Sequence, residues 1–304
     1  MLRLRRSSIL LLCVAAALPA QTKTVAERLG YPKDAKLLIL HADDLGMAHT
    51  VNVASFEALD KGLISSASAM IPTPWITEVA AYARAHPNAD LGLHLTLNSE
   101  WETYRWGSVE SKDKVPSLLD STGTFPNDVP PLLAKAKLPE IERELRAQID
   151  RAFALGIKPT HVDSHMGALF ATPELTATYM KVARDYRLPF LYFRLDPRLP
   201  QPPLTDNDMV LDTVIVAGDE VPRDKWMEFY VNAIASLKPG LSEIIVHLGR
   251  DDAELQAVMV NHEPYGAAWR QRDLDVVMSP VFKKALQDNG VMLITWRELQ
   301  VLAR

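Results

Sequence analysis

The stretch that decides the fold runs from Leu37 to Gly46 and reads L-L-I-L-H-A-D-D-L-G. Its first four residues form a short apolar run, which predicts a buried β-strand. Asp43 and Asp44 follow where that strand is expected to emerge into a loop. Two adjacent carboxylates cannot both ionise cheaply at a half-buried position. The pattern therefore predicts a cation or a positively charged partner beside them.

Two later segments repeat this layout, in which a polar residue of the metal-ligand type ends a short apolar run. G-L-H-L-T-L contains His94, and H-V-D-S-H contains His161 and His165. Borderline metals accept mixed imidazole and carboxylate ligands. The segments together predict a mononuclear metal site of one carboxylate and two imidazoles, with a spare carboxylate beside it. A hydrogen-bonded structural histidine is the alternative at each single position, and it weakens because several such positions are expected to share one face.

Short apolar strands alternate with helical patterns along the rest of the chain. Strands are expected at 36–41, 64–71, 91–97, 160–162, 190–193, 243–247 and 291–294, and helices at 50–60, 75–84, 139–153, 173–185, 225–237 and 280–287. This alternation predicts a single-domain α/β fold, a distorted (β/α) barrel of about seven parallel strands with helices outside. No G-x-G-x-x-G loop follows the first strand, which favours a barrel over an open sheet. Stretches 99–136 and 196–222 interrupt the pattern and are interpreted as insertions on the rim of the site.

Composition indicates an ordinary globular protein, with 304 residues, 48% of them hydrophobic, 23% charged, and a formal net charge of -5. One domain over residues 21–304 accounts for this length. No basic patch stands out, so nucleic-acid binding has no electrostatic support. Residues 1–20 differ, because three arginines precede a short apolar run and small residues follow it. This pattern predicts a secretory signal peptide, with an N-terminal membrane anchor as the alternative.

The only cysteine, Cys13, lies inside that apolar run. Removal of a signal peptide would leave a mature protein without thiols, which excludes disulfides and cysteine-ligated metals. We therefore expect a periplasmic or secreted protein that has no stable membrane insertion once the signal is removed.

Seven short motifs occur in order along the chain: H-A-D-D-L-G, V-N, G-L-I-S-S-A-S-A-M, L-G-L-H-L-T-L, K-P-T-H-V-D-S-H, E-I-I-V-H and D-L-D-V-V-M-S-P. The ordered set covers nearly the whole mature chain and resembles the YdjC/ChbG-like carbohydrate deacetylase family, a relative of the polysaccharide deacetylases. The resemblance implies a distorted (β/α) barrel and one divalent metal ion, either zinc or magnesium. It also implies removal of acetyl groups from N-acetylated sugars such as chitooligosaccharides.

The resemblance also implies roles for individual residues. The implied metal ligands are Asp44, His94 and His165. Asp43 matches the catalytic base of the family, and His247 in E-I-I-V-H matches a histidine that serves as general acid. Arg194 follows the fifth expected strand and resembles an arginine that orients the carboxylate of Asp43.

The chain departs from the family pattern two positions after His165, where Gly167 replaces the usual histidine. This departure affects the expected substrate more than the expected reaction. Two alternatives remain: a metal-dependent hydrolase of another amide or ester, and a catalytically inactive glycan-binding protein on the same fold. The spare carboxylate of Asp43 favours catalysis, because a binding protein does not need it. The sequence does not specify the sugar, its chain length or the oligomeric state.

Other polar and aromatic residues have simpler expected roles. Asp163 is expected either to accept a hydrogen bond from a metal-binding histidine or to cap a strand end, and His41 to pack on its strand. Trp101 and its aromatic neighbours in the long insertion are expected either to pack within the loop or to contact sugar rings. Arg270 and Asp273 are expected in a solvated ion-pair cluster.

Overall fold

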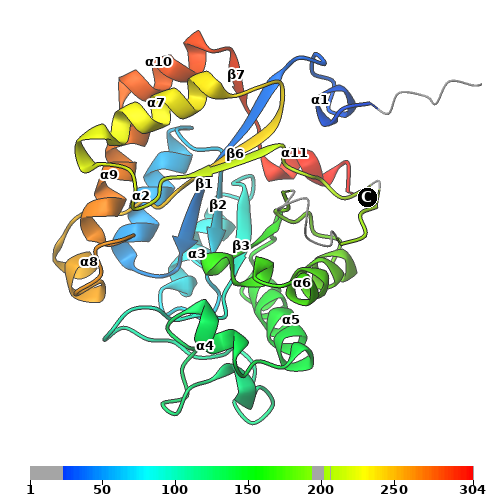
Figure 1. Ribbon diagram of the computed structural model, residues 1–304, viewed down its shortest axis with the longest axis vertical. Helices are drawn as coiled ribbons and strands as arrows, with labels where there is room; N and C mark the ends of the chain where they lie inside the picture. Colours follow the sequence, from blue (N-terminus) through cyan, green and yellow to red (C-terminus); the bar gives the residue numbers. More distant parts are fainter. Residues whose placement is uncertain (1–22, 194–201, 206, 304) are drawn as a thin grey trace, which may run out of the picture.

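The computed structural model describes residues 23–193, 202–205 and 207–303. Within them, parallel strands form one curled sheet with helices around it (Figure 1). The strand order is β4-β3-β2-β1-β6-β5, and β7 pairs with the first residues of β1. The strands are β1 Lys36–Leu45, β2 Ser66–Ala69, β3 Leu91–Leu95, β4 Val162–Ser164, β5 Thr213–Val216, β6 Gly240–Val246 and β7 Val291–Leu293. The predicted distorted barrel is confirmed.

The helices connect successive strands and cover the outside of the sheet (Figure 1). They are α1 Val25–Arg28, α2 His49–Asp60, α3 Ile76–Ala85, α4 Val129–Leu133, α5 Leu138–Ala154, α6 Pro173–Asp185, α7 Trp226–Ser236, α8 Ala253–Val258, α9 Ala267–Met278, α10 Pro280–Asp288 and α11 Trp296–Gln300. Short 3-10 turns occur at Pro116–Leu118, His165–Phe170 and Arg223–Lys225. The helices expected from sequence lie within one or two residues of these bounds.

Strand β1 is buried on both faces, which explains its nearly continuous apolar sequence. Leu38 and Leu40 pack in the core between the sheet and the helices. Leu37 and Ile39 point to the opposite face and pack with Trp296 in a second apolar cluster inside the curl. The same alternation places His41 and Asp43 on the inner face, above that cluster. The apolar inner cluster thus forms a floor for the polar side chains near the strand ends.

Among the described residues, no strand pairing joins the two end strands of the sheet, β4 and β5. The segment expected as a fifth strand, 190–193, instead makes isolated bridges there, Val162↔Phe190 to β4 and Phe193↔Leu211 just before β5. The observed β5 lies instead in the stretch interpreted as a rim insertion, so that interpretation was wrong there. Its four residues, T-V-I-V, pair with β6 and with no other strand among the described residues. So short an edge strand within a Pro-rich stretch has no clear sequence pattern. Residues 1–20 and Arg194 lie outside the described residues, so the structure places neither the expected signal peptide nor that arginine.

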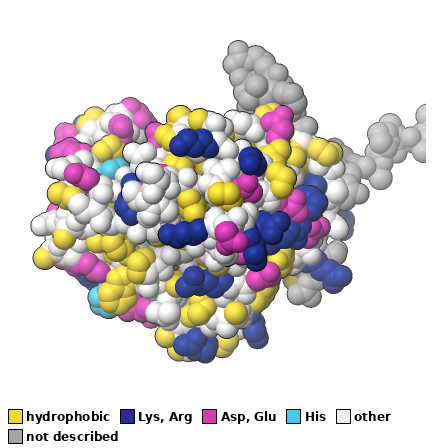
Figure 2. All heavy atoms as spheres, turned by 90° about the horizontal axis from the view of Figure 1, so that it is seen from below, with side chains coloured by type: hydrophobic (Ala, Val, Ile, Leu, Met, Phe, Trp, Pro, Cys, Tyr) yellow, Lys and Arg dark blue, Asp and Glu magenta, His cyan; other side chains and the backbone are white. Residues whose placement is uncertain are grey.

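Among the described residues, no helix combines the length and apolar character needed to cross a membrane. Figure 2 shows one face of the molecule, on which basic and acidic side chains both occur with hydrophobic ones between them.

Candidate metal centre and active site

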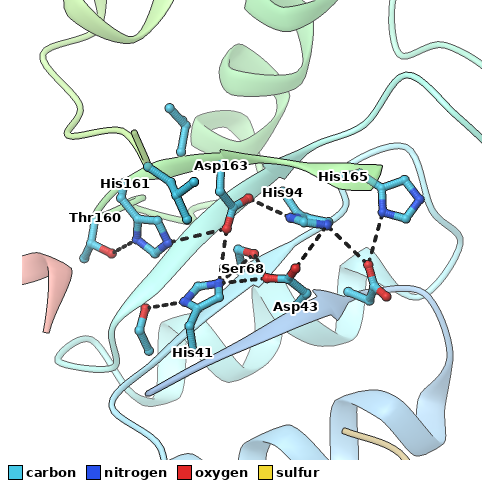
Figure 3. Close-up of polar contacts among 12 residues, drawn as sticks. His41, Asp43, Ser68, His94, Thr160, His161, Asp163 and His165 are labelled. Carbon is cyan, nitrogen blue, oxygen red and sulfur yellow. Dashed lines mark hydrogen bonds and ion pairs between the residues drawn. The ribbon is translucent and has the colours of Figure 1, made fainter. Parts of the chain in front are cut away.

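The polar side chains expected at the site converge inside the curled sheet (Figure 3). Asp43 and Asp44 lie near the end of β1, His94 on β3 and His165 directly after β4. Because all strand pairs are parallel, their carboxyl ends lie at one end of the barrel, where sites of this architecture form.

Three of these side chains surround one point. The Oδ1 atom of Asp44 lies 3.4 Å from Nε2 of His94 and 3.3 Å from Nδ1 of His165. One donor atom from each residue lies within 4.8 Å of the others. All three side chains are buried, yet Oδ1 of Asp44 has no hydrogen-bond partner among the described residues. A buried carboxylate oxygen without a donor, facing two imidazole nitrogens, fits a divalent cation held by three protein ligands.

Each of the two histidines has a carboxylate at its other ring nitrogen. Nδ1 of His94 lies 2.7 Å from Oδ1 of Asp163, and Nε2 of His165 lies 2.9 Å from Oε2 of Glu100. A carboxylate in this position fixes the ring and raises the basicity of the nitrogen that faces the metal. Sequence analysis did not identify Glu100, although its place just after the third strand was a usable signal.

The backbone of Asp44 adopts a left-handed conformation, with φ 71°. Aspartate tolerates this region better than most residues, and strain of this kind persists where the surroundings enforce it. Nη2 of Arg270, on α9, donates to Oδ2 of Asp44 at 2.6 Å, and Nε of Arg270 donates to the carbonyl of Tyr265. Arg270 therefore holds one carboxylate oxygen and leaves Oδ1 for the cation. The expectation that Arg270 is solvated was wrong, because its side chain is 1% exposed.

The charges of the cluster follow from these contacts. Burial would raise the pKa of Asp44, but the Arg270 guanidinium and His165 lower it well below its usual value. Burial would lower the pKa of His165, but Glu100 and Asp44 raise it to about 10. Burial likewise opposes protonation of His94, while Asp43 and Asp163 raise its pKa overall. Near neutral pH, His165 therefore holds a proton in the place where a cation would bind.

Asp43 lies beside this triad as a separate carboxylate. Its Oδ2 is 3.7 Å from Nε2 of His94 and 3.7 Å from Nε2 of His247. Its Oδ1 is 3.2 Å from Nε2 of His41. The side chain thus reaches from the metal ligands to the histidine that follows β6.

His247 is fixed through its backbone. Its N–H donates to Oδ2 of Asp273 at 2.8 Å, and Oδ1 of Asp273 accepts hydrogen bonds from Trp226 and Tyr230. Burial lowers the pKa of His247 to about 4, so its imidazole is neutral near neutral pH. Asp273 is 1% exposed, which corrects its expected place in a solvated cluster.

The site opens into a cavity of about 430 Å³, a size typical of small-molecule pockets. The metal-ligand set, Asp43 and His247 line its polar side. An apolar side is formed by Phe170, Leu191, Val214, Val216 and Ile245. Gly167, with φ 63°, also lines the cavity.

The aromatic residues of the long insertion are not part of this lining. Trp101 is 1% exposed and Trp106 is 4% exposed. Their rings pack against each other, with centroids 5.1 Å apart. The loop-packing alternative therefore holds for both, and their packing supports the loop that carries Glu100.

The family model described as YdjC-like protein matches residues 37–288, a range that includes all the site residues above. The chain belongs to the YdjC-like family. The family resemblance predicted from the ordered motifs is thus confirmed.

Curated relatives align with this chain over most of their length. A carbohydrate deacetylase of Thermus thermophilus is 32% identical over 284 residues, covering 90% of this chain and 97% of the relative. A carbohydrate deacetylase of Brevibacillus brevis is 31% identical over 263 residues, covering 86% and 99%. A chitooligosaccharide deacetylase of Serratia marcescens is 26% identical over 275 residues, covering 87% and 99%. The crystal structure of EF3048 from Enterococcus faecalis has the same fold, with a TM-score of 0.73 at 24% identity over 87% of this chain and 99% of that one.

Proposed function

We propose that this protein is an exported, metal-dependent carbohydrate deacetylase that removes the acetyl group from an N-acetylated sugar. The observation that carries the proposal is the pairing of a three-ligand cluster, Asp44, His94 and His165, with the separate carboxylate of Asp43. Relatives named carbohydrate deacetylase, which align over nearly their whole length, support the reaction class.

A divalent cation bound by the three ligands would supply an acidified water and polarise the amide carbonyl. The donor set of two imidazoles and one carboxylate suits zinc better than magnesium, which prefers oxygen ligands. The carboxylates behind His94 and His165 keep the ligand nitrogens turned toward Asp44. Arg270 keeps the carboxylate of Asp44 in place.

Asp43 serves as the general base, because its carboxylate lies beside the ligands without being one of them. It takes a proton from the attacking water as the water adds to the acetyl carbonyl. His247 is neutral in the resting site, so it must gain a proton before it can act as an acid. Oδ2 of Asp43 lies 3.7 Å from Nε2 of His247, and substrate binding can shorten this distance. We infer that Asp43 passes the proton to His247, which then protonates the leaving amine.

The direct test uses zinc-loaded and chelator-treated protein. It measures acetate release from a panel of N- and O-acetylated mono- and oligosaccharides and of acetylated non-sugar amides and esters, and it measures sugar binding by calorimetry. We expect release from an N-acetylated sugar that chelation abolishes and zinc restores. The variant Asp43→Asn should bind zinc normally and lose about 10²- to 10⁴-fold in kcat, since general bases contribute that much. Turnover of only non-sugar amides or esters would favour the alternative hydrolase. Sugar binding without any turnover would favour the inactive binding protein.

Export is proposed from the sequence pattern of residues 1–20. The test is to express the full chain in a bacterium with a periplasm and to sequence the N-terminus of the folded protein recovered outside the cytoplasm. A mature chain that begins near residue 21 is expected. An uncleaved chain held in the membrane fraction would instead indicate the N-terminal anchor.

A further inference from the structure

A layer of fully buried polar side chains lies directly beneath the site, between the metal ligands and the apolar floor. It contains His41 of β1, Ser66 and Ser68 of β2, and His161 and Asp163 at β4. Buried polar groups are costly unless they are paired, so their contacts indicate what the layer does.

His41 makes the largest number of these contacts (Figure 3). Its Nδ1 atom lies 3.0 Å from Oγ of Ser66, and its Nε2 atom lies 3.0 Å from Oγ of Ser68. The same Nε2 atom is 3.2 Å from Oδ1 of Asp43 and 3.1 Å from Oδ2 of Asp163. Nε2 of His41 therefore lies between the carboxylate of Asp43, the proposed base, and that of Asp163, the partner of His94.

These two carboxylates have different partners above the layer. The other oxygen of Asp163 contacts Nδ1 of His94, a proposed metal ligand, at 2.7 Å. The other oxygen of Asp43, the proposed base, lies 3.7 Å from His94 and from His247. Removing the His41 ring would thus take away the one side chain among the described residues whose Nε2 atom lies within 3.2 Å of both carboxylates.

We propose that His41 is a positioning residue that couples the general base to the metal ligand set. It holds Asp43 directly, and it holds His94 through Asp163. The inference deepens the proposed function and rests on a cation binding at Asp44, His94 and His165. A simple packing role on the strand, as expected from sequence, does not account for four oxygen atoms around one imidazole.

A competing interpretation places a second cation in this layer, because donor atoms of His41, His161 and Asp163 also lie within 4.8 Å of one another. Both nitrogens of His41 are hydrogen-bonded to serine hydroxyls at 3.0 Å, whereas Nε2 of His94 and Nδ1 of His165 face Asp44 only at 3.4 and 3.3 Å. We therefore assign the cluster to a hydrogen-bonded support, and the zinc stoichiometry tests this choice.

The experiment is a double-mutant cycle on zinc affinity, measured by competition with a chromophoric chelator. The variants are His41→Ala, Asp163→Asn and the double variant. Each single variant is expected to weaken zinc binding about 10- to 100-fold, the usual cost of losing a partner behind a metal ligand. His41 and Asp163 are proposed to act on the same ligand, His94, so their effects should not add. The zinc affinity of the double variant should therefore lie within about threefold of that of the more strongly affected single variant.

His161→Gln is the matched control. His161 is equally buried in the same layer and stacks on Trp296, but its Nε2 is 3.8 Å from Asp163, and its Nδ1 faces the hydroxyl of Thr160. Its zinc affinity should stay within about threefold of the wild type. If His41→Ala does not fold, His41→Gln replaces it in the cycle, with a smaller loss expected because an N–H donor remains.

The effect of His41 on Asp43 is tested separately, by the kinetics of the His41 variants. For a zinc-saturated enzyme, His41→Ala should lower kcat and alter its pH profile with KM nearly unchanged, and His41→Gln should restore part of kcat. Wild-type zinc affinity in a folded His41 variant, additive losses in the cycle, or two bound zinc ions per wild-type chain would overturn the proposal. Zinc binding without deacetylation of any sugar would instead refute the proposed function, since the affinity cycle can still be read. A wild-type chain that binds no zinc would overturn both.

Discussion

Glu243 of β6 is buried, and neither of its carboxylate oxygens has a hydrogen-bond partner among the described residues. Burial raises its pKa from 4.5 to about 8; His41 opposes the rise, and Asp163 and Asp43 add to it. Folded protein therefore keeps a proton on Glu243 in a pH range where the unfolded chain has lost it. In that range the native state binds more protons, so the free energy of unfolding must fall as pH rises.

The window and the magnitude follow from the two pKa values. The cost of burying Glu243 to the free energy of unfolding is absent below pH 4.5, the pKa of Glu243 in the unfolded chain. It grows between about pH 4.5 and 8 and stays constant above the pKa of Glu243 in the folded protein. At about 1.4 kcal/mol per pKa unit, the full penalty is on the order of 4 to 5 kcal/mol. Glu243→Gln keeps the volume and removes the ionisation, so its stability relative to the wild type should increase by that order between about pH 5 and pH 9.

The assay is urea unfolding of both proteins in the presence of a chelator, followed by tryptophan fluorescence at several pH values. The pH-dependent difference between the two proteins reports on Glu243 and on the groups coupled to it, such as His41. A difference that stays flat from about pH 5 to pH 9 would refute the reasoning. A wild type that gains stability over the variant with rising pH would show instead that Glu243 is ionised and paired with His41.

Three further outcomes are expected. Contact with Glu100 and Asp44 raises the pKa of His165 to about 10, so zinc must displace a proton when it binds. Calorimetry in buffers of different ionisation enthalpy should therefore show proton release. The zinc affinity should also fall as the pH falls. Glu100→Gln should weaken zinc binding about 10- to 100-fold. Glu102→Gln should not, since the exposed side chain of Glu102 accepts a hydrogen bond from Asn261 and not from a proposed metal ligand. Gly92→Ala should lower the free energy of unfolding by about 1 to 3 kcal/mol, and the melting temperature with it. The reason is that the new Cβ would lie 2.3 Å from the His161 ring. An unchanged melting temperature would show that the ring moves freely.

The strand-end acids and histidines could be predicted from sequence because parallel strands bring their carboxyl ends together. An apolar run followed by Asp43 and Asp44 indicates both the strand and the position at which its carboxyl end is reached. Arg270 could not be found in this way, since R-Q-R-D resembles a solvated surface and its burial depends on the packing of α9. Its partner Asp44 belongs to β1, which is distant in the sequence.

The carboxylates of Glu100 and Glu243 were not predicted from the sequence, for different reasons. Glu100 lies in a loop without periodicity, so only the folded loop brings it to His165. Glu243 stands inside an apolar strand run, where an acid contradicts the pattern and was a usable signal. The role of His41 depends on contacts with Ser66 and Ser68 of β2 and with Asp163 of β4, which a single strand pattern does not encode.

The most direct test of the account is a crystal structure of the zinc-loaded protein with anomalous data collected at the zinc absorption edge. The account predicts one peak, bounded by Oδ1 of Asp44, Nε2 of His94 and Nδ1 of His165, with Asp43 beside it and outside the coordination sphere. Zinc found instead among His41, His161 and Asp163, or ligated by Asp43 in place of Asp44, would contradict it.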